Sequence, residues 1–267
     1  MTIFYYSIVF AYGLLIGSFL NVCICRIPLE ESVVKPPSHC PNCGTRLTAV
    51  DLVPVFSYLF LRGKCRHCKA KISLKYPMLE LLTALIYLPL FYKYGQNGHY
   101  IEFFAAAYLM SILIVVFFID LKHQIIPDGL VILGLAGGIA LTVYNLFRPV
   151  AIFHDRAWWN PIVGMLAGSG FLFLVAIIGL LIYKEEAMGF GDVKLLAAIG
   201  GYLGWKMTLT ALLTSIILSA LVSVILMALK IRDRKDHIPL GPFIVTGTYI
   251  TLLFGWDILK ILYPSFV

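Results

Sequence analysis

The sequence predicts an all-α polytopic membrane protein with about eight transmembrane helices. The mean hydropathy of the chain is +0.91, and Asp, Glu, Lys and Arg make up only 13% of its 267 residues, against roughly 25% in soluble domains. The apolar residues gather in runs of about 20, the length at which a helix crosses a bilayer. Most of such a chain must face lipid or other helices.

Eight apolar runs are expected to form the spans. The first is not a cleavable signal peptide, because its apolar run is long and its basic residues follow it rather than precede it. Val193–Trp205 is short and rich in glycine, and it has the least certain ends. The spans in chain order are Ile3–Cys23, Tyr76–Tyr92, Ile101–Ile119, Gly129–Phe147, Pro161–Tyr183, Val193–Trp205, Met207–Leu229 and Ile238–Leu262.

The basic residues predict the orientation, because Lys and Arg collect in cytoplasmic loops. Eight spans with both termini outside place residues 26–75, the only sizeable polar segment, in the cytoplasm. The net charge of +7 is then explained without a nucleic-acid partner. Of the 21 basic residues, those left on the outer side are Lys93, Arg148, Arg156, Lys206 and Lys260.

Four cysteines in the polar segment have the spacing C-x2-C-x21-C-x2-C. Each CxxC places two thiolates on one turn, and two such turns supply the four sulfur ligands of a tetrahedral Zn²⁺. The alternative is a pair of disulfides or redox motifs, which a cytoplasmic location disfavours. A closed four-cysteine site has no open coordination position, so this Zn²⁺ is expected to be structural. The ligands are Cys40, Cys43, Cys65 and Cys68, with His39 and His67 as bystanders.

Three segments are therefore expected along the chain. Residues 1–24 form the first transmembrane helix, residues 25–75 form the cytoplasmic zinc-binding loop, and residues 76–267 form a transmembrane bundle.

Two carboxylates stand at the cytoplasmic ends of predicted spans. Asp120 ends the third span and Asp192 begins the sixth, so both are expected at one depth on one side of the membrane. Ionisable groups at such positions are costly and are functional candidates. If the two converge, they share one proton, and one acts as general base on a water while the other acts as acid. That is aspartyl peptidase chemistry. The alternatives without a catalytic role are an exposed helix-end carboxylate for Asp120 and a helix N-cap for Asp192.

The segment "GFGDVK" surrounds the second of these carboxylates. Gly189 and Gly191 cost helix stability, but they allow a substrate strand to approach the backbone and let Asp192 be positioned. Lys194 is expected to pair with Asp192 or with phospholipid, and Asp128 is expected to cap the fourth span or to support the site.

An ordered set of motifs resembles the bacterial type IV prepilin leader peptidases, which are GxGD membrane aspartyl peptidases. "GSFLNVCICRIP" (Gly17–Pro28) comes first, the two CxxC motifs follow, and "ISLKYPMLELLTA" (Ile72–Ala84) comes next. Asp120 with "IPD" (Ile126–Asp128), "GFGDVKLLAAIG" (Gly189–Gly200) and "IPLGPF" (Ile238–Phe243) complete the set, which covers nearly the whole chain.

The resemblance implies that Asp120 and Asp192 are the catalytic pair. It further implies cleavage of the short basic leader of type IV prepilins or type II secretion pseudopilins, after a glycine, on the cytoplasmic side of the bacterial inner membrane. The same family N-methylates the new N-terminal residue with S-adenosylmethionine, in forms that carry the large cytoplasmic loop. Glu80 is the first guess for a polar group near that methyl donor, although an interhelical hydrogen bond is an equally good interpretation.

Two other functions stay open on the sequence. The first is a membrane transporter or assembly scaffold, in which the aspartates belong to an ion pathway and the zinc module serves for docking, although no internal repeat supports a transporter. The second is a peptidase without methylation. The sequence holds no HExxH motif, so a zinc metallopeptidase is excluded.

Overall fold

A computed structural model describes residues 2–153, 157–183, 189–231 and 238–262. Its long elements are helices, and the described residues contain no β-strand. The chain divides into two compact units, Met1–Gln96 and Asn97–Val267.

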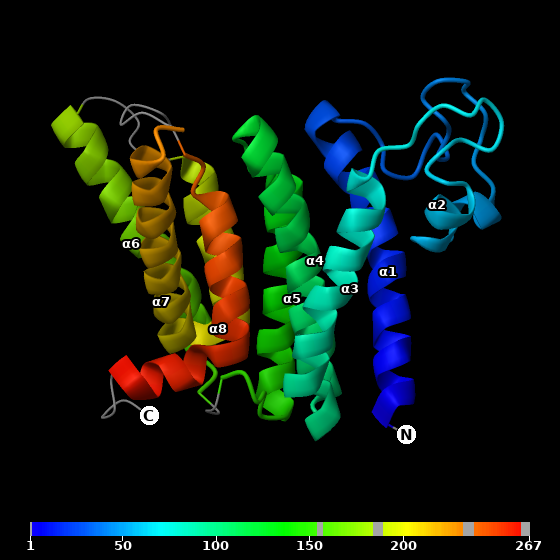
Figure 1. Cartoon of the computed structure of the whole chain (residues 1–267). Coiled ribbons are helices and arrows are strands. Elements are labelled where there is room, and N and C mark those ends of the chain that lie inside the picture. The colour runs from blue at the N-terminus through cyan, green and yellow to red at the C-terminus, as the bar shows by residue number, and fades with distance from the viewer. Residues whose placement is uncertain (1, 154–156, 184–188, 232–237, 263–267) are drawn as a thin grey trace. The chain divides into compact units, whose positions relative to one another are not determined.

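Unit 1 is a helical pair with a long loop between its members. Helices α1 (Thr2–Arg26) and α3 (Lys75–Lys93) pack against each other, blue and cyan in Figure 1. The loop holds the short α2 (Phe56–Phe60) and the 3₁₀ turns η1 (Ile27–Leu29) and η2 (Ala49–Leu52), and η3 (Gly95–Asn97) follows α3.

Glycines on α1 set how closely this pair approaches. A Cβ at Gly13 would lie 2.5 Å from the Cα of Ala84, and one at Gly17 would lie 2.7 Å from the Cα of Glu80. Real side-chain atoms do not come so close to a backbone, so both positions require glycine. This is the small-residue packing that lets helices meet in a membrane.

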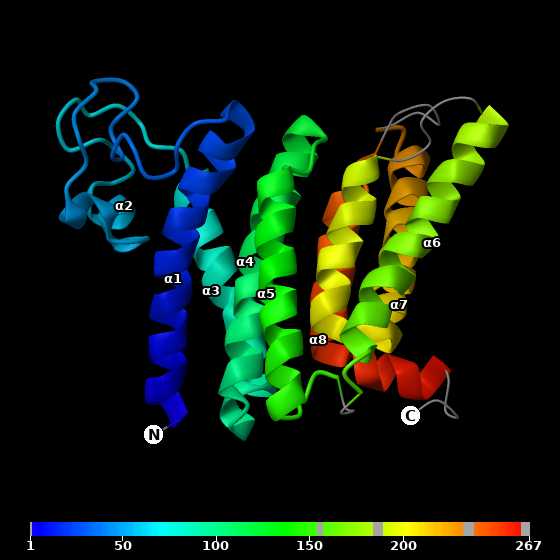
Figure 2. The same cartoon turned by 180° about the vertical axis from the view of Figure 1, so that it is seen from behind.

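Unit 2 consists of α4 (Tyr100–His123), α5 (Asp128–Phe147), α6 (Asn160–Tyr183), α7 (Phe190–Ala228) and α8 (Gly241–Leu262). Seen from behind in Figure 2, the yellow first part of α7 lies between α5 and α6. Close backbone approach holds it there. A Cβ on Gly164 of α6 would meet the carbonyl oxygen of Gly200 at 2.6 Å, and one on Gly138 of α5 would meet the Cα of Gly201 at 3.3 Å.

Helix α7 is broken at Gly204, so it forms two arms. Its 39 residues would extend about 58 Å as one straight helix, twice the thickness of the hydrocarbon core. Gly204 has φ 70° and ψ 172°, a conformation that is essentially restricted to glycine. The amide of Trp205 just after the break donates to Oδ1 of Asn160 at 3.0 Å, which satisfies the hydrogen-bonding group that the break exposes.

The expected fold class is confirmed. Six described helices are long and apolar enough to cross a membrane. With α3 and the second arm of α7, the number of helical segments is the expected eight. The two arms correspond to the expected spans Val193–Trp205 and Met207–Leu229. Large apolar side chains face outward, as lipid contact requires, for example Phe147 at 82% and Leu181 at 75% exposed.

Two boundaries differ from expectation. Helix α8 begins at Gly241 rather than at Ile238, because the ring of Pro242 fits only the first turn of a helix. The boundary between the two compact units falls after Gln96 in the sequence, so α3 belongs to the same unit as α1 and the loop. The functional division into residues 1–24, 25–75 and 76–267 stays a prediction.

Candidate active site and metal centre

Asp120 lies in the last turn and a half of α4 and is 5% exposed. Its Oδ2 accepts a hydrogen bond of 3.1 Å from the backbone amide of Gly241, the first residue of α8. The helix N-terminus is suited to this contact, because its first amides have no partner within the helix. Asp120 is therefore held by a defined donor and is not an exposed helix-end carboxylate.

Asp192 lies in the first turn of α7 and is 9% exposed. The N-cap of this helix is Gly189, three residues before Asp192, so the N-cap alternative is wrong. The carboxylates of Asp192 and Asp120 are close enough to interact electrostatically. Among the described residues neither carboxylate is in an ion pair. The structure thus brings together, in unit 2, two buried carboxylates from separate helices.

The glycines of the "GFGD" segment have different surroundings. A Cβ on Gly191 would lie 3.0 Å from the Cβ of Ile126, so glycine lets α7 begin close to the α4–α5 connection. A Cβ on Gly189 would meet only Oδ2 of Asp192, at 3.8 Å. The space on the Cβ side of Gly189 therefore holds no other described atom within 4 Å, as an approaching peptide strand would require.

Lys194 does not pair with Asp192. Its Nζ lies 2.8 Å from Oδ1 of Asp128, with the two side chains 38% and 68% exposed. Asp128 is the first residue of α5, and the cap position before it is Pro127, so Asp128 is not a cap. The ion pair joins the starts of α5 and α7. Two further acidic residues, Glu185 and Glu186, precede the "GFGD" segment and lie outside the described residues.

The two CxxC segments of unit 1 have the same local structure. In each, the amide of the first cysteine donates to a carbonyl five residues later, from Cys40 to Thr45 at 2.9 Å and from Cys65 to Ala70 at 2.8 Å. The residue after each second cysteine is left-handed, with φ 68° at Gly44 and 60° at Lys69. The paired turns aim their sulfur atoms at a common point.

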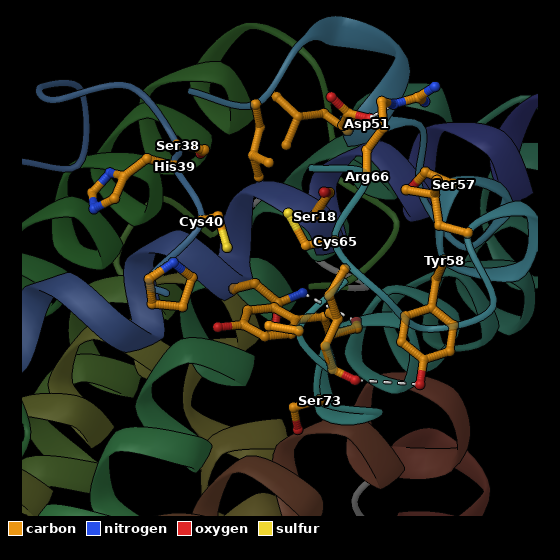
Figure 3. Close-up of a pocket in the computed structure, with 18 of the residues that line it drawn as sticks. Ser18, Ser38, His39, Cys40, Asp51, Ser57, Tyr58, Cys65, Arg66 and Ser73 are labelled. Carbon is orange, nitrogen blue, oxygen red and sulfur yellow. Dashed lines mark hydrogen bonds and ion pairs between the residues drawn. The ribbon is translucent and has the colours of Figure 1, made fainter. Parts of the chain in front are cut away.

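This cluster fits a tetrahedral metal ion. The Sγ atoms of all four cysteines lie within 4.8 Å of one another, and those of Cys40 and Cys68 are 3.8 Å apart. Sulfur atoms about 2.3 Å from a tetrahedral Zn²⁺ are about 3.8 Å from each other. All six cysteines are free thiols. The cluster could therefore hold a metal, and Figure 3 shows Cys40 and Cys65 among the residues that line a cavity.

Polar contacts tie the cluster to the rest of the loop. The Asn42 amide donates to Cys68 Sγ at 3.5 Å, and this bond, with one from the backbone of Ala70, lowers the pKa of the Cys68 thiol to about 6. A low pKa favours the thiolate that a metal needs. Bonds from Thr48 and Arg66 lower the pKa of Asp51 to about 2. Arg66 Nε lies 2.7 Å from Asp51 Oδ1.

Comparisons with known proteins agree with both parts of this arrangement. Residues 11–94 match a family model described as the bacterial peptidase A24 N-terminal domain. Residues 107–224 match the model of the type IV leader peptidase family.

The chain belongs to the type IV leader peptidase family.

Three relatives in this family share the name prepilin leader peptidase/N-methyltransferase. The protein of Aeromonas hydrophila is 34% identical over 96% of this chain and 93% of its own. The protein of Bacillus subtilis (strain 168) is 34% identical over 95% of this chain and 96% of its own. The protein of Myxococcus xanthus (strain DK1622) is 35% identical over 82% of this chain and 62% of its own. No solved structure matches the chain.

Sequence reasoning missed one residue beside the carboxylate pair of this leader peptidase. Gly241 contacts Asp120 across 121 positions of the chain. The motif "IPLGPF" was the only sequence signal for Gly241, and the sequence analysis assigned no function to that motif. Glu80, expected near a methyl donor, lies on α3 in unit 1, 7% exposed, and Oε2 accepts the amide of Val55 at 2.8 Å.

Proposed function

We propose that the chain removes the short basic leader from type IV prepilins or type II secretion pseudopilins, with Asp120 and Asp192 as the catalytic pair. The observation that carries the proposal is the pair itself, two buried carboxylates from α4 and α7 that interact electrostatically. The names of the relatives supply the substrate class.

The chemistry follows from the two carboxylates sharing one proton. The ionised carboxylate takes a proton from a water molecule, which attacks the scissile carbonyl, and the protonated carboxyl gives its proton to the carbonyl oxygen. As the C–N bond breaks, the first carboxyl passes the proton taken from water to the leaving amine, and the second recovers its proton from the gem-diol hydroxyl. The hydrogen bond from Gly241 fixes the orientation of Asp120. The ion pair of Lys194 with Asp128 supports the position at which α7 begins, and Gly189 leaves room for the substrate strand.

The second proposed activity is N-methylation of the new N-terminal residue with S-adenosylmethionine as methyl donor. The names of the relatives include an N-methyltransferase, and this chain matches the N-terminal family model as well as the peptidase model. We assign the methyl-transfer region to unit 1, with Zn²⁺ held by the four cysteines as a structural ion that fixes the loop.

The proposed location is the bacterial inner membrane, with the carboxylate pair at the cytoplasmic face. The candidate spans support a multi-pass protein, and the excess of basic residues in residues 26–75 supports a cytoplasmic loop. Membrane lipid and a pilin precursor are then the natural partners, and no nucleic acid is required.

The test is mass spectrometry of a prepilin incubated with the reconstituted protein and S-adenosylmethionine. Loss of the leader plus the mass of one methyl group is the expected result. Loss of the leader alone would favour the peptidase without methylation. An unchanged prepilin with intact enzyme would sink the proposal and favour a transporter or scaffold.

A further inference from the structure

Unit 1 contains a cavity of about 450 Å³, within the range of small-ligand sites. It lies among α1, α3 and the cysteine loop, and Figure 3 shows Ser18, Tyr58 and Asp51 around it. All its lining residues belong to this one unit. The leader-cleavage chemistry proposed above uses none of them.

Two motifs that the peptidase chemistry leaves unexplained meet at this cavity. "GSFLNVCICRIP" contributes Ser18, Asn21 and Val22, and "ISLKYPMLELLTA" contributes Tyr76 and Glu80. Their approach depends on the close contact of α1 and α3 at Gly17. Asn21 Nδ2 bonds the carbonyl of Tyr76 at 3.1 Å and so links the two motifs directly. The two segments therefore build one common site.

Glu80 gives this site its chemical character. It is 7% exposed, it lines the cavity together with Ser18, and it accepts a hydrogen bond of 2.8 Å from the amide of Val55. Among the described residues it has no cationic partner. A buried anion without a counter-charge is costly. A cationic ligand would remove that cost.

The other walls fit the remainder of such a ligand. The cavity lining includes the rings of Tyr58 and Tyr76, which can stack on a planar heterocycle or face a cation. Hydroxyl and amide groups from Ser18, Ser57 and Asn21 provide polar contacts in the same space.

The lining also carries charges of both signs: Glu80 and Asp51 are acidic, and Arg26, Arg66 and Lys71 are basic. Arg66 is paired with Asp51, which leaves Glu80 to face a positive group and Arg26 and Lys71 to face a carboxylate. These groups suit a compact ligand that carries an aromatic base, a positive centre and a carboxylate.

We propose that this cavity is the binding site for S-adenosylmethionine, with Glu80 as the counter-charge to the cationic methyl donor. The inference rests on the proposed function, which requires that donor. It goes further by naming the site and the residue that recognises the positive charge. The Asp51–Arg66 ion pair and the metal cluster then act as the outer wall that holds the loop over the ligand.

The test is equilibrium binding of radiolabelled S-adenosylmethionine to the full chain in lipid nanodiscs. Glu80→Gln keeps the size of the side chain and an oxygen to accept the Val55 amide, but it removes the charge. We expect its affinity for the donor to fall about 30-fold or more, as when one partner of a buried charge pair is removed. Glu102→Gln is the matched control, because Glu102 is also buried and also accepts a backbone amide, that of Ala151 at 3.0 Å, in unit 2.

A second variant tests the cavity by its volume. Val22→Trp places an indole in the cavity from α1, whereas Leu15→Trp places one on a 59% exposed position of the same helix. We expect Val22→Trp to lose donor binding and Leu15→Trp to keep it. Leader cleavage and metal content serve as fold controls and should match wild type in every variant.

The outcomes separate this inference from the function on which it rests. Wild-type donor affinity in either Glu80→Gln or Val22→Trp overturns the site assignment and leaves both proposed activities standing. A wild-type protein that cleaves prepilin but binds no donor overturns the methyl-transfer proposal and the site with it. Failure of wild type to cleave contradicts the peptidase proposal alone.

Discussion

The carboxylate of Asp120 is hydrogen-bonded to the backbone of Gly241, at 3.1 Å. This contact joins the end of α4 to the start of α8, and it leaves no space for a side chain. A Cβ on Gly241 would collide with Oδ2 of Asp120. The absence of a side chain at residue 241 is therefore a condition for the observed position of Asp120.

Gly241→Ala should lower the rate of leader cleavage about 10- to 100-fold, because displacing a catalytic group by about 1 Å costs that much. The rate constant for cleavage of a prepilin measures this effect. Gly170→Ala is the control, since an added Cβ there meets no atom within 4 Å. Equal rates in the two variants would show that Gly241 does not position Asp120.

Asp128→Asn should reduce cleavage by no more than about fivefold. Its ion pair with Lys194 is exposed, and exposed pairs contribute about 1 kcal/mol or less. High salt should shrink the difference between variant and wild type, because salt screens such pairs. A fall in the cleavage rate as large as that caused by substituting Asp120 or Asp192 would indicate that Asp128 takes part directly in the chemistry.

Cys65→Ser should remove the metal. The cysteine cluster can bind about one Zn²⁺ per chain, so elemental analysis of the purified protein should give about one in wild type and close to none in the variant. Cys25→Ser should keep the ion, because Cys25 is outside the cluster. A zinc-free wild type whose loop resists proteolysis as well as a metal-loaded sample would contradict a structural role for the ion.

Gly204→Ala should destabilise unit 2 by about 1–3 kcal/mol, because alanine is strained at φ 70° and ψ 172°. Its Cβ would also collide with Oδ1 of Asn160, which accepts the Trp205 amide. Unfolding in detergent micelles, compared with Gly170→Ala, measures the difference. Equal unfolding free energies for Gly204→Ala and Gly170→Ala would show that the fold does not depend on the glycine conformation at the break in α7.

The sequence predicted what local composition determines. Long apolar runs located the spans, and the gap between Trp205 and Met207 came within one residue of the break at Gly204. The cysteine spacing located the cluster. Asp120 and Asp192 were identified because each stands at a span end, and the structure places them together.

Contacts between distant helices could not be predicted in this way. Lys194 pairs with Asp128, although Asp192 is nearer in the sequence, because the starts of α5 and α7 lie next to each other. The contact of Gly241 with Asp120 depends on the position of α8, and the cavity around Glu80 depends on glycines that bring α1 to α3. Composition and spacing contain no information on which helices become neighbours.

The most direct test of the central claim is leader cleavage by Asp120→Asn and Asp192→Asn, each reconstituted and shown to bind S-adenosylmethionine as wild type does. Asparagine keeps the shape of the side chain but cannot take up or release the proton. The account predicts that each substitution lowers the cleavage rate about 10³-fold or more. Full cleavage by either variant would contradict the assignment of these two residues as the catalytic pair.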